Sequence, residues 1–259
     1  MTERLPTLTI VIPTYNERER IAELVNDVFA QCERSGVDLE VVIVDDNSPD
    51  GTGAVADELA TMYRMKVVHR AGKLGLGTAV VAGFAVASAD VVGVMDADFS
   101  HPPSLVPKMM AVFRATGAEA LVASRYVPGG GTQNWPLGRR VMSRFGSFLA
   151  RGLSPIRDAT SGFFLIRRSI ATNTTIKAGG FKIALELIVR GRVERLVEVP
   201  FVFDDRQRGQ SKMSRKEALG YFVQLKDLYL VRWSNRRPVW RYQKLSETEV
   251  ERIARRPQA

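Results

Sequence analysis

The residues best placed to do chemistry are two aspartates separated by one alanine. Asp96 and Asp98 follow an apolar run at residues 91–95 that is typical of a buried strand. Because side chains alternate along a strand, both carboxylates are expected to point the same way at its carboxyl end. Two such anions repel unless a cation lies between them, and carboxylate oxygens suit magnesium or manganese. The pair predicts a divalent-metal site that holds a diphosphate. The alternative is a solvated acidic turn.

The elements that position this pair alternate between strand and helix. Runs typical of strands and patterns typical of helices follow one another at residues 8–12, 18–34, 39–44, 54–65, 66–69, 78–87 and 91–95. This alternation predicts an α/β fold with a mostly parallel central sheet and helices on both faces. In such sheets, ligands bind at the carboxyl ends of the strands.

Polar side chains follow the other expected strands at that same end. Tyr15 and Glu17 follow the first strand, and Asp46 follows the second. A nucleobase can stack on tyrosine, and carboxylates accept hydrogen bonds from ribose hydroxyls or a guanine edge. Lys73 lies in a glycine loop before a helix, where exposed amides and the helix N-terminus favour an anion. The loop has neither Walker A spacing nor a full dinucleotide-binding fingerprint.

Basic residues outnumber acidic residues, with 37 lysines and arginines against 28 aspartates and glutamates. The formal charge is +9 and the isoelectric point about 9.9, which suits nucleic acid, a membrane surface or phosphorylated small molecules. The planar guanidinium of arginine matches phosphate geometry, so we predict that basic residues in the second half of the chain bind the phosphate of an acceptor molecule. The alternative is that these residues form a generic basic surface. These cations are Arg125, Arg139, Arg140, Arg206 and Lys212.

Composition narrows the class of protein. Hydrophobic residues make up 45% of the chain, as in ordinary globular proteins, and the single Cys32 indicates a reducing compartment. No run supplies the roughly 20 strongly apolar residues of a membrane span. The arginine-rich stretches at 139–144 and 206–215 lack the interleaved aromatic residues of a nucleic-acid-binding surface, so we expect no nucleic-acid partner.

The later elements are less regular. Further helices are expected at 105–116, 139–153, 181–189 and 215–233, and further strands at 120–124, within 158–166 and at 193–202. Residues 127–137 read as a glycine-rich loop without an element. The helix at 215–233 is expected to dock on the core in preference to contacting a membrane, and the charged tail at 236–259 is expected to fray.

Several motifs occur in the same order as in inverting family-two glycosyltransferases of the A-type (GT-A) nucleotide-sugar fold. They are IPTYNE at 12–17, VDDNSPDGT at 44–52, KLGLG at 73–77 and MDADFSHPP at 95–103. A second set makes the chain resemble the dolichol-phosphate (polyprenol-phosphate) mannose synthases in particular. It comprises SRY at 124–126, DATSGF at 158–163, GFKIALEL at 180–187 and FxxRxxGxSK at 203–212. The resemblance covers roughly residues 7–230.

The resemblance implies a role for each site residue. The nucleotide sugar would contact Pro13, Tyr15, Glu17, Val44, Asp46, Lys73, Asp96, Ala97, Asp98, Arg125, Arg206 and Lys212. The metal, magnesium or manganese, would be held by Asp96 and Asp98, with Ser100 as a further ligand. The acceptor phosphate would meet Arg139, Arg140 and Ser211. Asp96, Asp98 and Arg125 would carry the catalysis as metal, donor and phosphate anchors.

The implied reaction transfers mannose from GDP-mannose to a polyprenyl (dolichyl-type) monophosphate with inversion. The product would be polyprenyl β-mannosyl phosphate with GDP. A transferase that uses another sugar, such as UDP-glucose, and a sugar-nucleotide-binding module without catalysis are the alternatives. We expect one GT-A domain at 1–235 and a basic tail at 236–259. We also expect a cytoplasmic protein attached to the cytoplasmic face of a membrane, either directly or through a small membrane-anchoring partner.

Overall fold

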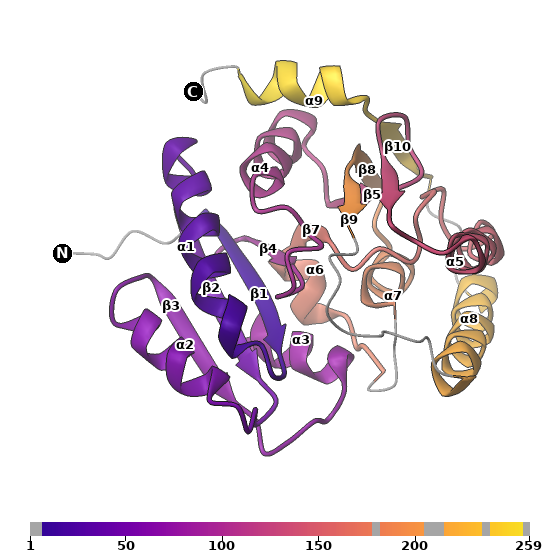
Figure 1. Cartoon of the computed structure of the whole chain (residues 1–259). Coiled ribbons are helices and arrows are strands. Elements are labelled where there is room, and N and C mark those ends of the chain that lie inside the picture. Colours follow the sequence, from indigo (N-terminus) through magenta and orange to yellow (C-terminus); the bar gives the residue numbers. More distant parts are fainter. Residues whose placement is uncertain (1–6, 178–181, 205–214, 235–238, 256–259) are drawn as a thin grey trace.

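The computed structural model in Figure 1 describes residues 7–177, 182–204, 215–234 and 239–255. Within these ranges the strands form an eight-stranded sheet in the order β10-β8-β5-β7-β4-β1-β2-β3 and a two-stranded sheet of β6 and β9. The strands are β1 (Leu8–Thr14), β2 (Leu39–Asp45), β3 (Met65–His69), β4 (Val91–Val94), β5 (Ala120–Ser124), β6 (Gly131–Gln133), β7 (Phe164–Arg167), β8 (Arg195–Pro200), β9 (Val202–Asp204) and β10 (Arg241–Lys244).

The large sheet is mostly parallel, which confirms the prediction. Strand β7 is the exception, because it lies antiparallel between β4 and β5. The helices are α1 (Arg18–Arg34), α2 (Thr52–Ala60), α3 (Leu76–Val86), α4 (Leu105–Thr116), α5 (Leu137–Leu149), α6 (Arg168–Asn173), α7 (Ile183–Arg190), α8 (Arg215–Ser234) and α9 (Glu247–Ala254).

Helices cover both faces of the sheet, as predicted. Side chains alternate along each strand, so Ile10 and Ile12 face one apolar cluster and Val11 faces the other. The first cluster includes residues of α1, α2, α4 and α9, and the second includes residues of α3, α6, α7 and α8. Helix α3 lies very close to the sheet, because a Cβ atom on Gly83 would fall 2.3 Å from Val11 Cγ1.

The C-terminal segment corrects one expectation. Residues 236–259 were expected to fray, but β10 pairs in parallel with β8 and α9 packs against α4. Ser246 and Glu249 form a capping box that begins α9, and Val250 is buried in the core. Lys108 of α4 pairs with Glu251. The described part of this segment, residues 239–255, is therefore ordered against β8 and α4.

Two other expectations were wrong in detail. The loop at 127–137 contains β6, which pairs in parallel with β9. The single strand expected at 193–202 is divided into β8 and β9, with Phe201 between them.

Helix α8 docks on the core, as expected, through the buried Leu225 and Leu228. Across the described residues, no helix has the length and apolar character needed to cross a bilayer.

Candidate active site at the carboxyl ends of the strands

Asp96 and Asp98 lie just beyond the carboxyl end of β4, where a tight turn presents them. The carboxylate of Asp98 accepts a hydrogen bond from the Ser100 backbone N–H (3.0 Å), and Phe99 adopts a φ of 62°. Asp96 is 43% exposed and Asp98 is exposed. Among the described residues, no lysine or arginine forms an ion pair with either carboxylate. The negative charge of the pair is therefore left for a ligand.

Ser100 supplies a test of the metal assignment. The residue is buried, and its hydroxyl has no hydrogen-bond partner in the described part of the chain. A buried polar atom without a partner is costly, and a ligand would remove that cost. The described ranges hold no group of three or more His, Cys, Asp or Glu side chains arranged for a metal. The donor set fits a divalent cation that takes its other ligands from phosphate and water.

His101, whose role sequence reasoning missed, holds Asp96 in place. The Asp96 backbone N–H donates to His101 Nδ1 (3.0 Å), and His101 Nε2 lies 3.7 Å from Asp96 Oδ2. The imidazole is buried and stacks on Phe163 with a centroid separation of 4.7 Å. Burial lowers the pKa of His101, which favours the neutral ring. The acceptor role of Nδ1 places the ring proton on Nε2, toward the Asp96 carboxylate.

Tyr15, which follows β1, contacts Lys73 in the loop before α3, and Glu17 lies two residues further along the chain. Lys73 Nζ lies 4.3 Å from the centroid of the Tyr15 ring, and Tyr15 is 38% exposed. Burial raises the pKa of Glu17, and the nearby carboxylates of Asp98, Asp50 and Asp96 raise it further, whereas Arg20 lowers it. The Glu17 and Asp98 carboxylates are therefore close enough to influence each other electrostatically.

Asp46 meets a partner that the sequence did not indicate. Arg70 Nη1 lies 2.7 Å from Asp46 Oδ1, and both side chains are buried. Arg70 also donates to the Thr78 hydroxyl (2.6 Å) and to the Gly75 carbonyl (3.3 Å). Burial raises the pKa of Asp46, while Arg70 lowers it. Arg70 therefore fixes the glycine loop against the end of β2.

Arg125, at the end of β5, is clamped by buried Asp158. Its Nε and Nη2 donate to the two Asp158 carboxylate oxygens (2.7 and 2.6 Å), and Nη2 also donates to Thr160 (2.8 Å). The guanidinium lies 5.0 Å from the Trp135 ring centroid. A guanidinium has five donors, and within the described residues Nη1 has no hydrogen-bond partner, so it can meet a ligand. Asp96 is close enough to raise the pKa of Arg125, although Asp158 raises it more.

The remaining predicted residues are placed as follows. Arg139 stacks over the Trp135 ring (4.1 Å), whereas Arg140 is exposed on α5. The side chains of Val44 and Ala97 are buried in the two apolar clusters, so they can face a ligand only through the main chain. Pro13 is half-buried in β1. Arg206, Ser211 and Lys212 lie outside the described residues.

Solved structures share this fold. The chain matches glucosyl-3-phosphoglycerate synthase from Mycobacterium tuberculosis, crystallised with Mn²⁺, UDP and glucosyl-3-phosphoglycerate, at a TM-score of 0.63 and 20% identity. The match covers 89% of this chain and 81% of that one. A mannosyltransferase from Pyrobaculum calidifontis, in complex with GDP-mannose and Mn²⁺, matches at a TM-score of 0.61 and 17% identity, over 86% and 65% of the two chains.

Curated relatives are closer in sequence. Dolichol-phosphate mannosyltransferase of Pyrococcus furiosus is 39% identical over 87% of this chain, which spans 64% of that protein. Its Saccharomyces cerevisiae namesake is 36% identical over 87% and 88% of the two chains. Polyprenol monophosphomannose synthase of Mycolicibacterium smegmatis is 39% identical over 79% and 80%. The family model described as "Glycosyl transferase family 2" matches residues 9–175. The chain belongs to glycosyl transferase family 2.

Proposed function

We propose that this chain transfers mannose from GDP-mannose to a polyprenyl monophosphate and so forms polyprenyl β-mannosyl phosphate and GDP. The observation that carries the proposal is the pair Asp96 and Asp98, which lies close enough to Glu17 to raise its pKa. Among the described residues, no lysine or arginine forms an ion pair with Asp96 or Asp98. The relatives at 36–39% identity are named for mannose transfer to dolichol or polyprenol phosphate. Those names favour mannose over the UDP-glucose alternative.

The donor would lie across the ends of β1, β2 and β4. Tyr15 offers an exposed ring for the base, and Glu17 and Asp46 offer carboxylates for hydroxyl or guanine-edge hydrogen bonds. The diphosphate would lie near Lys73 and the aspartate pair. Asp96, Asp98 and Ser100 would hold a magnesium or manganese ion. Such an ion stabilises the charge that develops on a leaving diphosphate.

The acceptor phosphate would approach from the side of Arg125 and Arg139. A phosphate monoester is already anionic near neutral pH, so its oxygen can attack the anomeric carbon with little help from a general base. The C–O bond to the sugar forms as the bond from the sugar to GDP breaks, and the in-line geometry inverts the anomeric centre. Fixed orientation of this kind can contribute on the order of 7–11 kcal/mol. With Nε and Nη2 of Arg125 engaged by Asp158, its Nη1 group would orient a phosphate oxygen.

A lipid acceptor also fits the surface of α5 and α8, which lie side by side (Figure 1). Tyr221 donates to the Gly146 carbonyl (2.8 Å) and Tyr229 to the Leu149 carbonyl (2.7 Å). Large apolar side chains nevertheless remain exposed on both helices. This apolar platform consists of Leu137, Val141, Met142, Phe145, Phe148, Leu219, Phe222, Val223, Tyr229, Leu230 and Trp233. An exposed apolar surface flanked by basic residues suits a membrane or a membrane-anchoring partner, at the cytoplasmic face.

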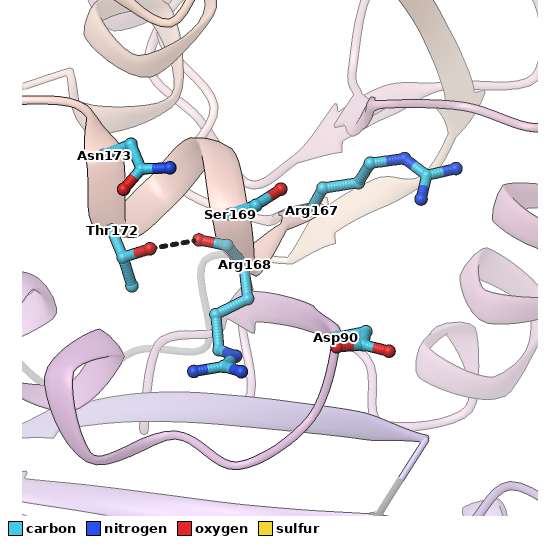
Figure 2. A pocket seen from close by; sticks show the side chains of 6 residues that line it. All are labelled: Asp90, Arg167, Arg168, Ser169, Thr172 and Asn173. Atoms are coloured by element: carbon cyan, nitrogen blue, oxygen red, sulfur yellow. Dashed lines mark hydrogen bonds between the residues drawn. The ribbon is translucent and has the colours of Figure 1, made fainter.

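The test is transfer of radiolabelled mannose from GDP-mannose to a short polyprenyl phosphate, with magnesium or manganese and then with a chelator. Metal-dependent label in the lipid is expected for the unmodified chain. The Asp98→Ala variant should lose turnover, whereas Asp90→Ala should keep it. Asp90 is an exposed aspartate at the opposite end of β4, beside Arg168 (Figure 2). Near-normal turnover in Asp98→Ala would contradict the metal assignment, and transfer from UDP-glucose alone would contradict the choice of donor.

A further inference from the structure

A second basic site lies on α5, apart from the aspartate pair. A cavity of about 290 Å³ is lined by Tyr126, Arg144, Ser147, Phe148, Arg151 and Arg157. Tyr126 follows β5, and Arg157 precedes the clamp residue Asp158. None of the lining residues has been placed in the donor site, and the cavity contains no acidic side chain in its lining. Its charge is therefore strongly positive.

Two of the three arginines that line this cavity, Arg144 and Arg151, are available to an anion. Arg144 lies over the Tyr126 ring (5.7 Å) and Arg151 over the Phe148 ring (5.2 Å). Within the described ranges, neither guanidinium forms an ion pair with a carboxylate. The nearby Asp158 carboxylate is already engaged by Arg125 and cannot neutralise them. Guanidinium groups held over aromatic rings keep their in-plane donors free for phosphate oxygens.

Ser147 gives an independent sign of a ligand. The residue is 3% exposed and lines the cavity, and its hydroxyl has no hydrogen-bond partner among the described residues. The buried Ser147 hydroxyl, which lies between two arginines of the helix, could donate a hydrogen bond to a ligand oxygen. Phosphate provides such an oxygen together with the negative charge that the arginines require.

We propose that this cavity binds the phosphate group of an anionic lipid while the lipid chains lie on the apolar platform. Phe148 belongs to both surfaces, because it lines the cavity and is 57% exposed on α5. A lipid whose phosphate enters the cavity therefore has its apolar part beside Phe148 and the neighbouring exposed side chains. The inference rests on the proposed lipid-facing role of α5 and α8, but it concerns a site separate from the donor site.

The experiment is flotation of the full chain with three kinds of phosphatidylcholine vesicle. The first contains no anionic lipid, the second contains phosphatidylglycerol and the third contains phosphatidic acid. The Arg144→Gln/Arg151→Gln variant should partition about 30-fold more weakly onto both anionic vesicles, as expected for two cations near the surface. The Ser147→Ala variant keeps the net charge and should bind roughly fivefold more weakly, as expected for one lost hydrogen bond. Inorganic phosphate, added as a competitor, separates a free-phosphate site from a lipid site.

The matched control is Arg167→Gln/Arg168→Gln, which removes the same charge at a different pocket (Figure 2), where Arg167 pairs with Val91 at the start of β4. This control should bind anionic vesicles within about twofold of the unmodified chain. An equal loss in the control, no change in Ser147→Ala, or full release by inorganic phosphate would each overturn the proposal. GDP binding and mannose transfer to a detergent-solubilised acceptor are measured in parallel. If the proposed transferase activity is wrong, the mannose-transfer assay will fail, and the vesicle assay will still test the lipid-binding cavity.

Discussion

Replacement of His101 by phenylalanine tests how the aspartate pair is held. Phenylalanine keeps an aromatic ring that can stack on Phe163 and contact Phe201, at the present separations of 4.7 and 5.8 Å. It removes Nδ1, which accepts the Asp96 N–H, and the Nε2–H that faces the Asp96 carboxylate. The change is therefore confined largely to two polar contacts of one residue.

The size of the effect follows from those contacts. The Asp96 N–H is partly buried, so losing its acceptor should lower the free energy of unfolding by about 1–3 kcal/mol. Residues that orient a metal ligand typically change metal affinity by about 10–100-fold when removed. We therefore expect the metal concentration for half-maximal transfer to rise by about that factor. Because Tyr15 and Asp46 are untouched, GDP binding without metal should change little.

Two measurements check this: chemical unfolding of the apoprotein, and transfer activity as a function of manganese concentration. The matched control is His69→Phe, since His69 is exposed and its contact with Asp57 (3.0 Å) lies at the surface. That control should stay within about 1 kcal/mol and keep its metal requirement. If His101→Phe showed the same metal requirement as the unmodified chain, the positioning role of His101 would be refuted.

Other perturbations test the fold and the donor loop. Arg70→Met leaves the Asp46 carboxylate buried without its cation, so the free energy of unfolding should fall by about 3–5 kcal/mol and calorimetric GDP affinity should weaken; equal stability would contradict this. Burial raises the pKa of Glu198 above 4.5, so its stabilising contribution is present below about pH 4.5 and is lost as pH rises through the raised pKa. The cost of Glu198→Gln in urea unfolding should therefore shrink as pH rises, and a growing cost would refute the assignment. Gly83→Ala would place a methyl group 2.3 Å from Val11 and should cost about 1–3 kcal/mol in thermal unfolding, with recovery in a Val11→Ala background.

Local patterns predicted the first half of the fold well because β1 and β2 bury contiguous apolar runs and α1 buries one apolar face at helical spacing. Strand β2 is buried along its whole length, and α1 begins and ends where the helical pattern does. The position of Asp96 and Asp98 beyond the carboxyl end of β4 was also predictable from strand direction, although a turn and not strand alternation presents the two side chains. Arg70 and His101 were not, because their roles depend on partners that only the folded chain brings close. Arg70, for example, reaches Asp46 because β2 and β3 are neighbours.

The second half was harder to predict for two physical reasons. Strand β7 is short and enters the sheet antiparallel between β4 and β5, and no local signal reveals where a strand inserts. Strand β10 has the sequence RYQK, which lacks an apolar alternation because it is a largely exposed edge strand. Its pairing with β8 supplies the backbone hydrogen bonds that the sequence pattern does not reveal.

The C-terminal segment contributes to the site although it lies beyond the family match at 9–175. Tyr242 of β10 donates to the buried Glu198 carboxylate, which also accepts the backbone N–H groups of Arg157 (2.8 Å) and Asp158 (3.0 Å). Asp158 in turn holds Arg125 through both carboxylate oxygens. Because these contacts form a continuous buried series, loss of the Tyr242 hydroxyl should alter the position of the Arg125 guanidinium. Strand β10 therefore helps to fix the loop that orients Arg125, the cation that we propose meets the acceptor phosphate.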